Sequence, residues 1–191
     1  MLKDEIEKLY NEYDQILAPI IAKIINDNYK YCKISEKIKW GWNYDQNLSI
    51  MATYDRNNNL IQINLFSVIK AYKEKLLIIV EYFVVHEIRH IFQNIKIKEH
   101  KAGICNDINS NLVEKWIYEN EHYEKSLDIN NNENPKYFMQ NCEIDAYAFS
   151  YALMKHKYKD VSCLYVPQYY GAEFYNIVND WLECFKNEIE N

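Results

Sequence analysis

Hydrophobic residues recur at helical spacing at the start of the chain. Between residue 2 and about residue 29 the apolar positions fall three or four apart, and they include Leu2, Ile6, Leu9, Tyr13, Ile16, Leu17, Ile20, Ile21 and Ile24. Apolar positions so spaced share one face of a helix, so the pattern predicts an amphipathic helix. Pro19 lies inside it and should kink it or divide it in two, because proline lacks the backbone N–H.

Alternating patterns come next and predict strands. Apolar side chains alternate over residues 37–45 and 48–54, and residues 60–64 read as a returning strand after a turn at Asn57, Asn58 and Asn59. Alternation places successive side chains on opposite faces of a sheet. We therefore expect a small, antiparallel-rich sheet.

Helical periodicity dominates the rest of the chain. Helices are expected over residues 66–97 with a break near Lys73 to Lys75, and over 112–127, 141–157 and 172–188, with Asn-rich loops at 102–111 and 128–135. Residues 76–92 are apolar on most sides, which predicts a buried helix. The length fits one domain over 1–191, with residues 1–35 as a helical segment packed on it. The expected class is a helix-dominated α+β fold.

Composition narrows the functional classes. The formal net charge of −6 gives no general attraction to nucleic acid or anionic lipid. The five cysteines are odd in number and form no Cys-x-x-Cys pair, which argues against a disulfide framework. The first residues carry acids where a secretory signal would be apolar, and no apolar run reaches membrane-spanning length. We expect a cytoplasmic protein without a nucleic-acid or membrane partner.

The candidate chemistry lies in the buried helix, in the sequence His86-Glu87-Ile88-Arg89-His90. Two histidines four residues apart share one helix face and can bind one metal ion. Glu87 points about 100° away from His86 and can act on a metal-bound water instead. Zinc would lower the pKa of that water, and the carboxylate would take its proton and pass it to the leaving amine. The alternative is a pair of core histidines bonded to backbone or acids, but one metal ion would account for several polar groups in an apolar helix.

A catalytic zinc ion usually has a third protein ligand. Metzincins would have Gly and His at positions 93 and 96, where this chain has Gln93 and Lys96. Glu143 is the better candidate, because it lies on the inward stripe of the helix predicted over 141–157. Asp145 falls about 200° away, outside that stripe, and stays the alternative ligand. A carboxylate near a helix N-terminus can also simply complement the helix dipole.

These residues resemble a known group. The HExxH sequence at 86–90, followed by Glu143-Ile144-Asp145-Ala146-Tyr147-Ala148-Phe149-Ser150, is similar to the ImmA/IrrE-like metallopeptidases, compact zincins common in phages and mobile elements. The resemblance covers roughly residues 60–155. It implies a zincin-like fold with the sheet beside the HExxH helix, Zn²⁺ bound by His86, His90 and Glu143, and Glu87 as catalytic base. It also implies an intracellular protein substrate, such as a transcriptional repressor.

Other roles stay open. Asp145, Tyr147 and Arg89 are candidates for contacts with the ligands or for a replacement ligand, although Arg89 could equally lie on a solvated helix face. An oxyanion donor could come from His122, Tyr165, Tyr169 or Tyr170, which packing would also explain. The expected function is a zinc peptidase acting on a protein or peptide. The alternatives are a non-catalytic zinc-binding regulator with the same fold and an interaction module without metal.

Overall fold

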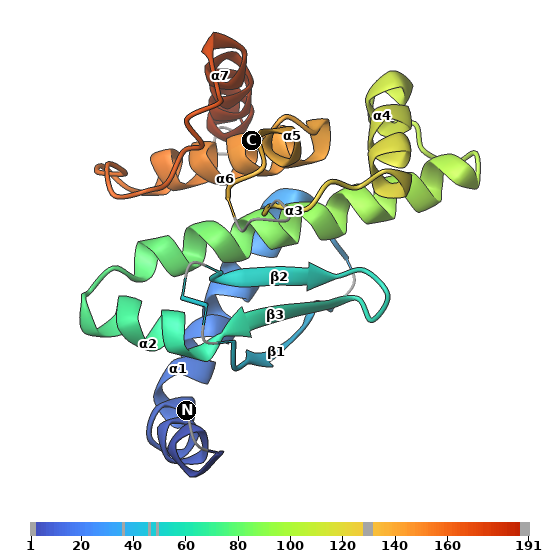
Figure 1. Cartoon of the computed structure of the whole chain (residues 1–191). Helices are drawn as coiled ribbons and strands as arrows, with labels where there is room; N and C mark the ends of the chain where they lie inside the picture. Colours follow the sequence, from blue (N-terminus) through green and yellow to red (C-terminus); the bar gives the residue numbers. More distant parts are fainter. Residues whose placement is uncertain (1–2, 36, 46, 49, 128–131, 188–191) are drawn as a thin grey trace. The chain divides into compact units, whose positions relative to one another are not determined.

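A computed structural model describes residues 3–35, 37–45, 47–48, 50–127 and 132–187 of the chain (Figure 1). Its elements in chain order are α1 (Lys3–Asn28), η1 (Tyr29–Cys32), β1 (Lys39–Asn43), β2 (Ala52–Asp55), β3 (Leu60–Asn64), α2 (Leu65–Lys73), α3 (Leu77–Lys101), α4 (Ser110–Glu121), α5 (Pro135–Phe138), α6 (Asn141–Lys157) and α7 (Ala172–Asn187). Four sequence predictions lie outside the described residues: the helix start at Leu2, the helix end at Glu188, position 49 of a strand and residues 128–131 of a loop. No helix among the described residues has the length and apolarity that a bilayer span requires.

Contacts group the chain into two compact units, Met1–Ile91 and Phe92–Asn191. The boundary falls inside α3. The first unit holds α1, the sheet, α2 and the part of α3 that carries the HExxH residues. The second unit holds the rest of α3 and α4 to α7. The helix-rich α+β class is as expected from the sequence.

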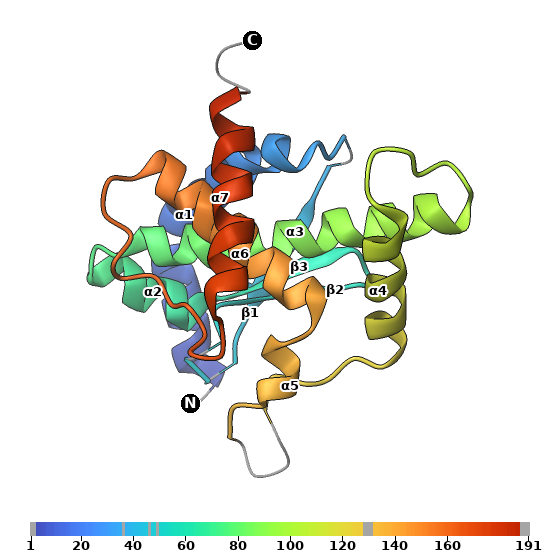
Figure 2. The same cartoon turned by 90° about the horizontal axis from the view of Figure 1, so that it is seen from above.

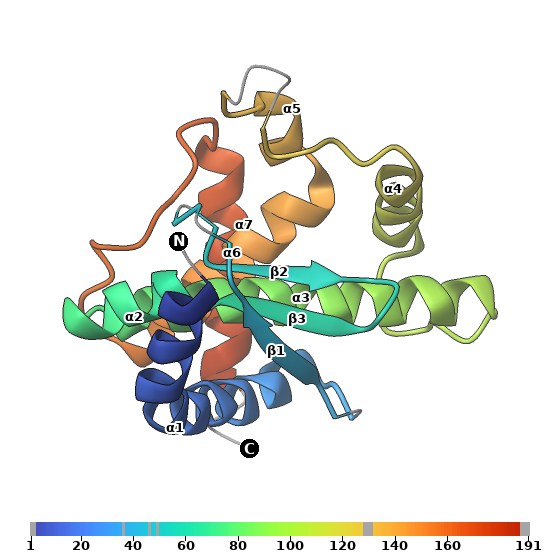
Figure 3. The same cartoon turned by 60° about the horizontal axis from the view of Figure 1, so that its bottom comes forward.

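The first unit contains a three-stranded sheet in the order β1-β3-β2 (Figure 3). β2 pairs with β3 in the antiparallel sense, with Ala52 opposite Ile63, whereas β1 runs parallel to β3, with Trp40 opposite Ile61. The sheet is therefore mixed, and the expectation of an antiparallel sheet holds for only one of its two strand pairs. Alternation reports which face a side chain occupies but not the direction of the neighbouring strand, which is why the sequence missed the parallel pair. The sheet lies alongside α3 in the same unit (Figures 1 and 3).

The end of β3 sets the start of α2. The side-chain oxygen of Asn64 accepts hydrogen bonds from the backbone N–H groups of Phe66 (3.0 Å) and Ser67 (3.3 Å), which caps the helix. The break predicted near Lys73 to Lys75 is confirmed. Lys75 adopts a left-handed conformation with φ 59°. Its backbone N–H donates to Tyr72 O, and that of Leu76 donates to Ala71 O, as in a Schellman ending.

Helix α1 presents an apolar stripe. Leu17, Ile21 and Ile25 recur four residues apart and are at most 4% exposed. The helix continues through Pro19 without a break in its assignment, and its axis changes direction along its length (Figure 3). α1 contacts α2, and Asp14 accepts a hydrogen bond from the indole N–H of Trp42 (2.7 Å).

The first part of α3 is buried, as its apolar pattern predicted. Five of its residues have no exposed surface: Val80, Tyr82, Val84, Val85 and Ile88. Polar side chains in the same stretch are buried too, and they include Glu81, which accepts a hydrogen bond from Asn28 Nδ2 (2.8 Å). This stretch therefore has core on several sides, and its polar groups need partners inside the protein.

The second unit is built around α6, which contacts α4, α5 and α7 (Figure 2). The bounds of α6 match those predicted. The ring of Phe149 meets Trp181 and Phe185 of α7 edge-on, at 5.0 and 5.5 Å between centroids. α6 is buried on nearly every side, so the expectation that Asp145 lies outside the inward stripe is wrong: Asp145 is only 7% exposed.

The segment after α3 differs from the expectations in two larger ways. α4 ends at Glu121, six residues before the predicted end, with His122 as its C-cap. A short helix, α5, begins at the last residue of the segment expected to be a loop and was not predicted. Pro135 starts it, and the side chain of Asn134 accepts a hydrogen bond from Lys136 N (3.1 Å). The pair Asn134-Pro135 is a helix-start signal that the Asn-rich composition concealed.

Candidate metal centre

The two histidines of the HExxH sequence converge within the first unit. His86 and His90 are 3% and 6% exposed, and their Nε2 atoms are 3.0 Å apart. Their rings meet edge-on, with centroids 4.6 Å apart. Two nitrogens bound to one tetrahedral zinc ion at about 2.0–2.1 Å would be roughly 3.3 Å apart. The observed separation is therefore close to that of two ligands of one ion.

The residues between the histidines are buried as well. Glu87 is 8% exposed and Arg89 is 4% exposed. The interpretation of Arg89 as part of a solvated helix face is therefore wrong. Charged groups at such depth are stable only when paired, and both residues have interaction partners in the structure. Their burial restricts water around the histidine pair and strengthens electrostatic interactions there.

Glu143 lies in the first turn of α6, in the second unit, and has no exposed surface. Its Oε1 atom accepts a hydrogen bond from the hydroxyl of Tyr123 (2.8 Å). Burial, together with the negative charge of Glu143, raises the pKa of Tyr123 well above its usual range, and the same two causes raise that of Tyr137. Both phenols therefore keep their protons at neutral pH, and Tyr123 is a constant donor to the carboxylate.

A side chain from α4 caps the helix that carries Glu143. The Glu119 carboxylate accepts hydrogen bonds from the backbone N–H groups of Asn141 (2.7 Å) and Cys142 (2.9 Å), and from the amide of Asn141 (2.6 Å). Gln140, the N-cap residue, makes no such bond with its own side chain. A carboxylate at this end also complements the helix dipole. Glu119 therefore fixes the turn on which Glu143 sits.

Gln93 connects the second part of α3 to the same turn. Its side-chain amide donates to the Cys142 carbonyl (2.9 Å) and to Oδ2 of Asp145 (2.8 Å). Cys142 is 1% exposed and lies in the core, and all five cysteines are free thiols. The Gln93 side chain therefore holds Cys142, which directly precedes Glu143, and Asp145, which lies two residues after it.

The other predicted site residues have local roles. His122 stacks on Tyr118 at 4.3 Å between centroids, and its Nδ1 lies 2.9 Å from the Tyr118 carbonyl. The hydroxyl of Tyr165 donates to Glu133 (3.0 Å). Tyr147 is buried, and its ring packs against those of Phe138, Tyr165 and Tyr170. The ring of Phe138 in turn stacks on Tyr169. Sequence reasoning missed Tyr123 and Glu119, which belong to no local motif, and it missed the bonds that Gln93 donates.

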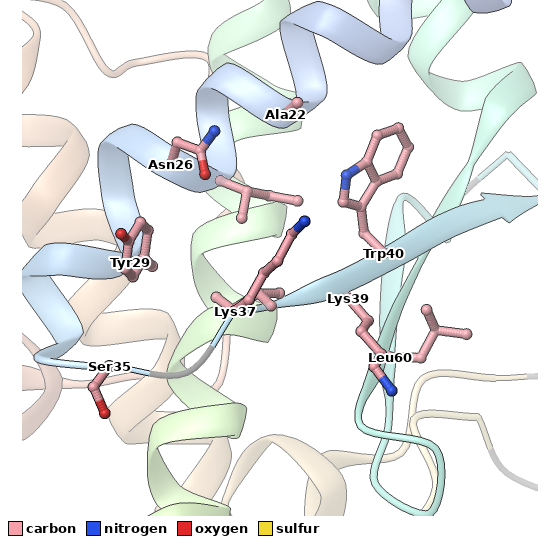
Figure 4. A pocket seen from close by; sticks show the side chains of 10 residues that line it. Ala22, Asn26, Tyr29, Ser35, Lys37, Lys39, Trp40 and Leu60 are labelled. Atoms are coloured by element: carbon pink, nitrogen blue, oxygen red, sulfur yellow. The ribbon is translucent and has the colours of Figure 1, made fainter.

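A separate hollow in the first unit lacks the chemistry of this site. It encloses about 740 Å³ and is lined by residues of α1, η1, β1 and their connections, together with Leu60. The side chain of Lys37 extends toward α1 beside Trp40 (Figure 4). None of the lining residues carries an imidazole, thiol or carboxylate, so the hollow offers a metal no suitable side chain.

A cluster of Glu99, Cys105 and Asp107 in the second unit also has ligand-type atoms close together. The ammonium group of Lys96 occupies it, at 2.7 Å from Glu99 and 2.8 Å from Asp107. These bonds outweigh the effect of burial and raise the pKa of Lys96, while the bond from Lys96 lowers that of Asp107. A lysine thus already occupies this cluster and offsets one of its two negative charges.

Comparisons with protein-family models, with curated proteins and with solved structures found no match for this chain. Its function therefore has to be inferred from its own residues.

Proposed function

We propose that this chain is a zinc-dependent peptidase that hydrolyses a peptide bond in an intracellular protein. His86, His90 and Glu143 would hold the zinc ion, and Glu87 would be the catalytic base. The observation that carries the proposal is the pair of buried imidazoles with Nε2 atoms 3.0 Å apart on the HExxH helix. Two imidazoles and a carboxylate are a donor set suited to zinc.

A metal ion explains the histidine pair better than a hydrogen bond between the rings. Two neutral imidazoles at 3.0 Å can share one proton, but the pair is buried beside Glu87 and Arg89 in a largely apolar helix. Burying polar groups costs free energy unless each is satisfied. One divalent ion would accept an electron pair from both rings, so a single ligand accounts for their convergence.

The choice of Glu143 as third ligand rests on the second unit. α3 is one helix from Leu77 to Lys101, and Gln93 follows His90 by three residues, about 60° short of a full turn. Gln93 and His90 therefore share one side of α3, and Gln93 holds the first turn of α6. Asp145 and Glu143 each accept a side-chain hydrogen bond, from Gln93 and Tyr123. Glu143 is favoured because it, and not Asp145, belongs with His86 and His90 to a group of side chains that could hold one ion.

The chain's own residues would divide the chemistry between them. Zinc would supply Lewis-acid chemistry, lowering the pKa of a water molecule toward about 7 and polarising the peptide carbonyl. Glu87, directly after a zinc-binding histidine, would take the proton of the attacking water and give it to the leaving amine. Among the described residues, β1 and β2 each pair with β3 alone, so the sheet has outer edges along which an extended peptide can bind.

Metal analysis and one conservative variant test the proposal. The purified protein should contain about one zinc per chain, and Glu87→Gln should keep that zinc while abolishing cleavage, because it preserves shape but removes the base. Cleaved proteins are sought as new N-termini in a proteome incubated with wild type and not with Glu87→Gln.

The outcomes separate the rival functions. Protein without bound zinc would rule out both the peptidase and the zinc-dependent regulator. One zinc per chain, with the same N-termini from wild type and Glu87→Gln, would instead indicate a non-catalytic zinc protein.

A further inference from the structure

We propose that Tyr123 is a positioning residue for the zinc ligand Glu143 and sets the affinity of the site for zinc. Its hydroxyl holds Oε1 of the carboxylate, so that Oε2 is the oxygen presented to the metal. This inference rests on the proposed function.

The first support is the nature of the donor. Glu143 has no exposed surface, and the Tyr123 hydroxyl donates to it at 2.8 Å. A lysine or arginine in this place would neutralise the carboxylate and compete with a cation. A phenol satisfies one oxygen and leaves the negative charge for the metal. A partner of this kind fixes the orientation of a ligand and makes it a better one.

The second support is that Tyr123 is itself held in place. Its ring meets that of Tyr137 edge-on, with centroids 6.0 Å apart and planes at 87°. The backbone N–H of the next residue, Glu124, donates to the side-chain oxygen of Gln140 (3.1 Å). Gln140 is the N-cap residue of α6, three positions before Glu143. The hydroxyl and the carboxylate are thus tied to the same helix end, although 20 residues separate them in the chain.

A second tyrosine nearby in the sequence provides a control, because the proposed role depends on where Tyr123 lies in the fold. Tyr118, on α4, also carries a phenol, but it is 64% exposed and stacks on His122. Removing that hydroxyl touches neither Glu143 nor its helix. Tyr118→Phe is therefore a matched control for Tyr123→Phe.

The test measures zinc affinity by competition with a chromophoric chelator. Tyr123→Phe keeps the ring and should bind zinc about 10-fold more weakly than wild type, at the lower end of the effect of losing such a partner. Tyr118→Phe should bind like wild type. In protein loaded with Co²⁺, the visible absorption bands should change in Tyr123→Phe and not in the control, which a loss of stability alone would not produce.

A double-mutant cycle shows whether Tyr123 acts through Glu143. In a Glu143→Gln background, adding Tyr123→Phe should change zinc affinity less than twofold, because the coupled partner is already altered. Unchanged affinity and an unchanged Co²⁺ spectrum in Tyr123→Phe would overturn this inference and leave the zinc site intact. A full effect in the Glu143→Gln background would also overturn it. Wild type that binds no zinc would overturn the proposed function and this inference together.

Discussion

Single residues differ in how well the sequence announces them. The roles proposed for His86, Glu87 and His90 follow from a spacing of four residues on one helix, and helical geometry alone brings the two rings together. Tyr123 has no such signal. It is one of 18 tyrosines, and its partner lies 20 positions away. Contacts of this kind depend on tertiary packing, which local periodicity does not encode.

The cap that Glu119 provides gives the first prediction at this scale. Glu119→Ala leaves the N–H groups of Asn141 and Cys142 without their acceptor. The free energy of unfolding should fall by about 2 kcal/mol, as for other lost caps and charged hydrogen bonds. Chemical denaturation measures it. Glu114→Ala, at an exposed position of the same helix, is the control and should change it by less than about 0.5 kcal/mol. Equal effects of the two variants would contradict the capping role.

At the scale of elements, the sequence predicts existence better than neighbours. The bounds of α6 and β3 coincide with those expected, because polar residues mark them: Asn141 and Lys157 are the ends of α6, and Asn59 and Asn64 mark the limits of β3. The direction of β1 and the short helix α5 were missed. Strand direction depends on the path of the connecting chain, and α5 is too short for a periodic pattern. The helix predicted over 112–127 was too long because Leu127, an apolar residue, was included in its pattern. Leu127 instead forms an isolated β-bridge with Glu133.

The break between α2 and α3 gives the second prediction. Lys75 has a positive φ of 59° at the Schellman ending, a conformation that costs a residue with a Cβ roughly 1 kcal/mol. Lys75→Gly should raise the free energy of unfolding by at most about 1 kcal/mol, seen as a higher or nearly unchanged melting temperature. The gain is limited because glycine also gives the unfolded chain more conformational freedom.

Lys70→Gly is the matched control in the body of α2. It should lower the free energy of unfolding by about 1 kcal/mol, since glycine disfavours helix interiors. If both glycine variants destabilise the protein alike, the left-handed conformation of Lys75 is not a source of strain.

At the scale of the molecule, α3 is the element common to both compact units. Its first part carries the histidine pair and its second part, through Gln93, holds the start of α6. The expectation of a single domain stays a prediction. At this scale the composition indicated only general properties of the protein, namely enough apolar residues for a core and a net charge of −6.

Removal of metal gives the third prediction, and it concerns the whole protein. A ligand that binds only the folded state at 100 times its Kd adds about 2.7 kcal/mol of stability. For a chain of this size that corresponds to a rise in melting temperature of about 5–10 °C. Calorimetry with zinc and with excess chelator should show this difference in wild type. His86→Ala should show no difference, and a wild-type protein insensitive to chelator would argue against the site.

The closure between Glu119 and Asn141 has a consequence for recognising relatives of this chain. Bonds at 2.7 Å and 2.9 Å join the end of α4 to the start of α6, and Asn134 N donates to Ser126 O (2.9 Å) farther out. These bonds hold the turn that carries Glu143 independently of the length of the segment between Ser126 and Asn134. Lengthening such an excursion twofold costs only about 0.6 kcal/mol. Insertions and deletions in this segment should therefore be tolerated during evolution. A sequence search that requires a fixed interval between Glu87 and Glu143 will then miss homologues.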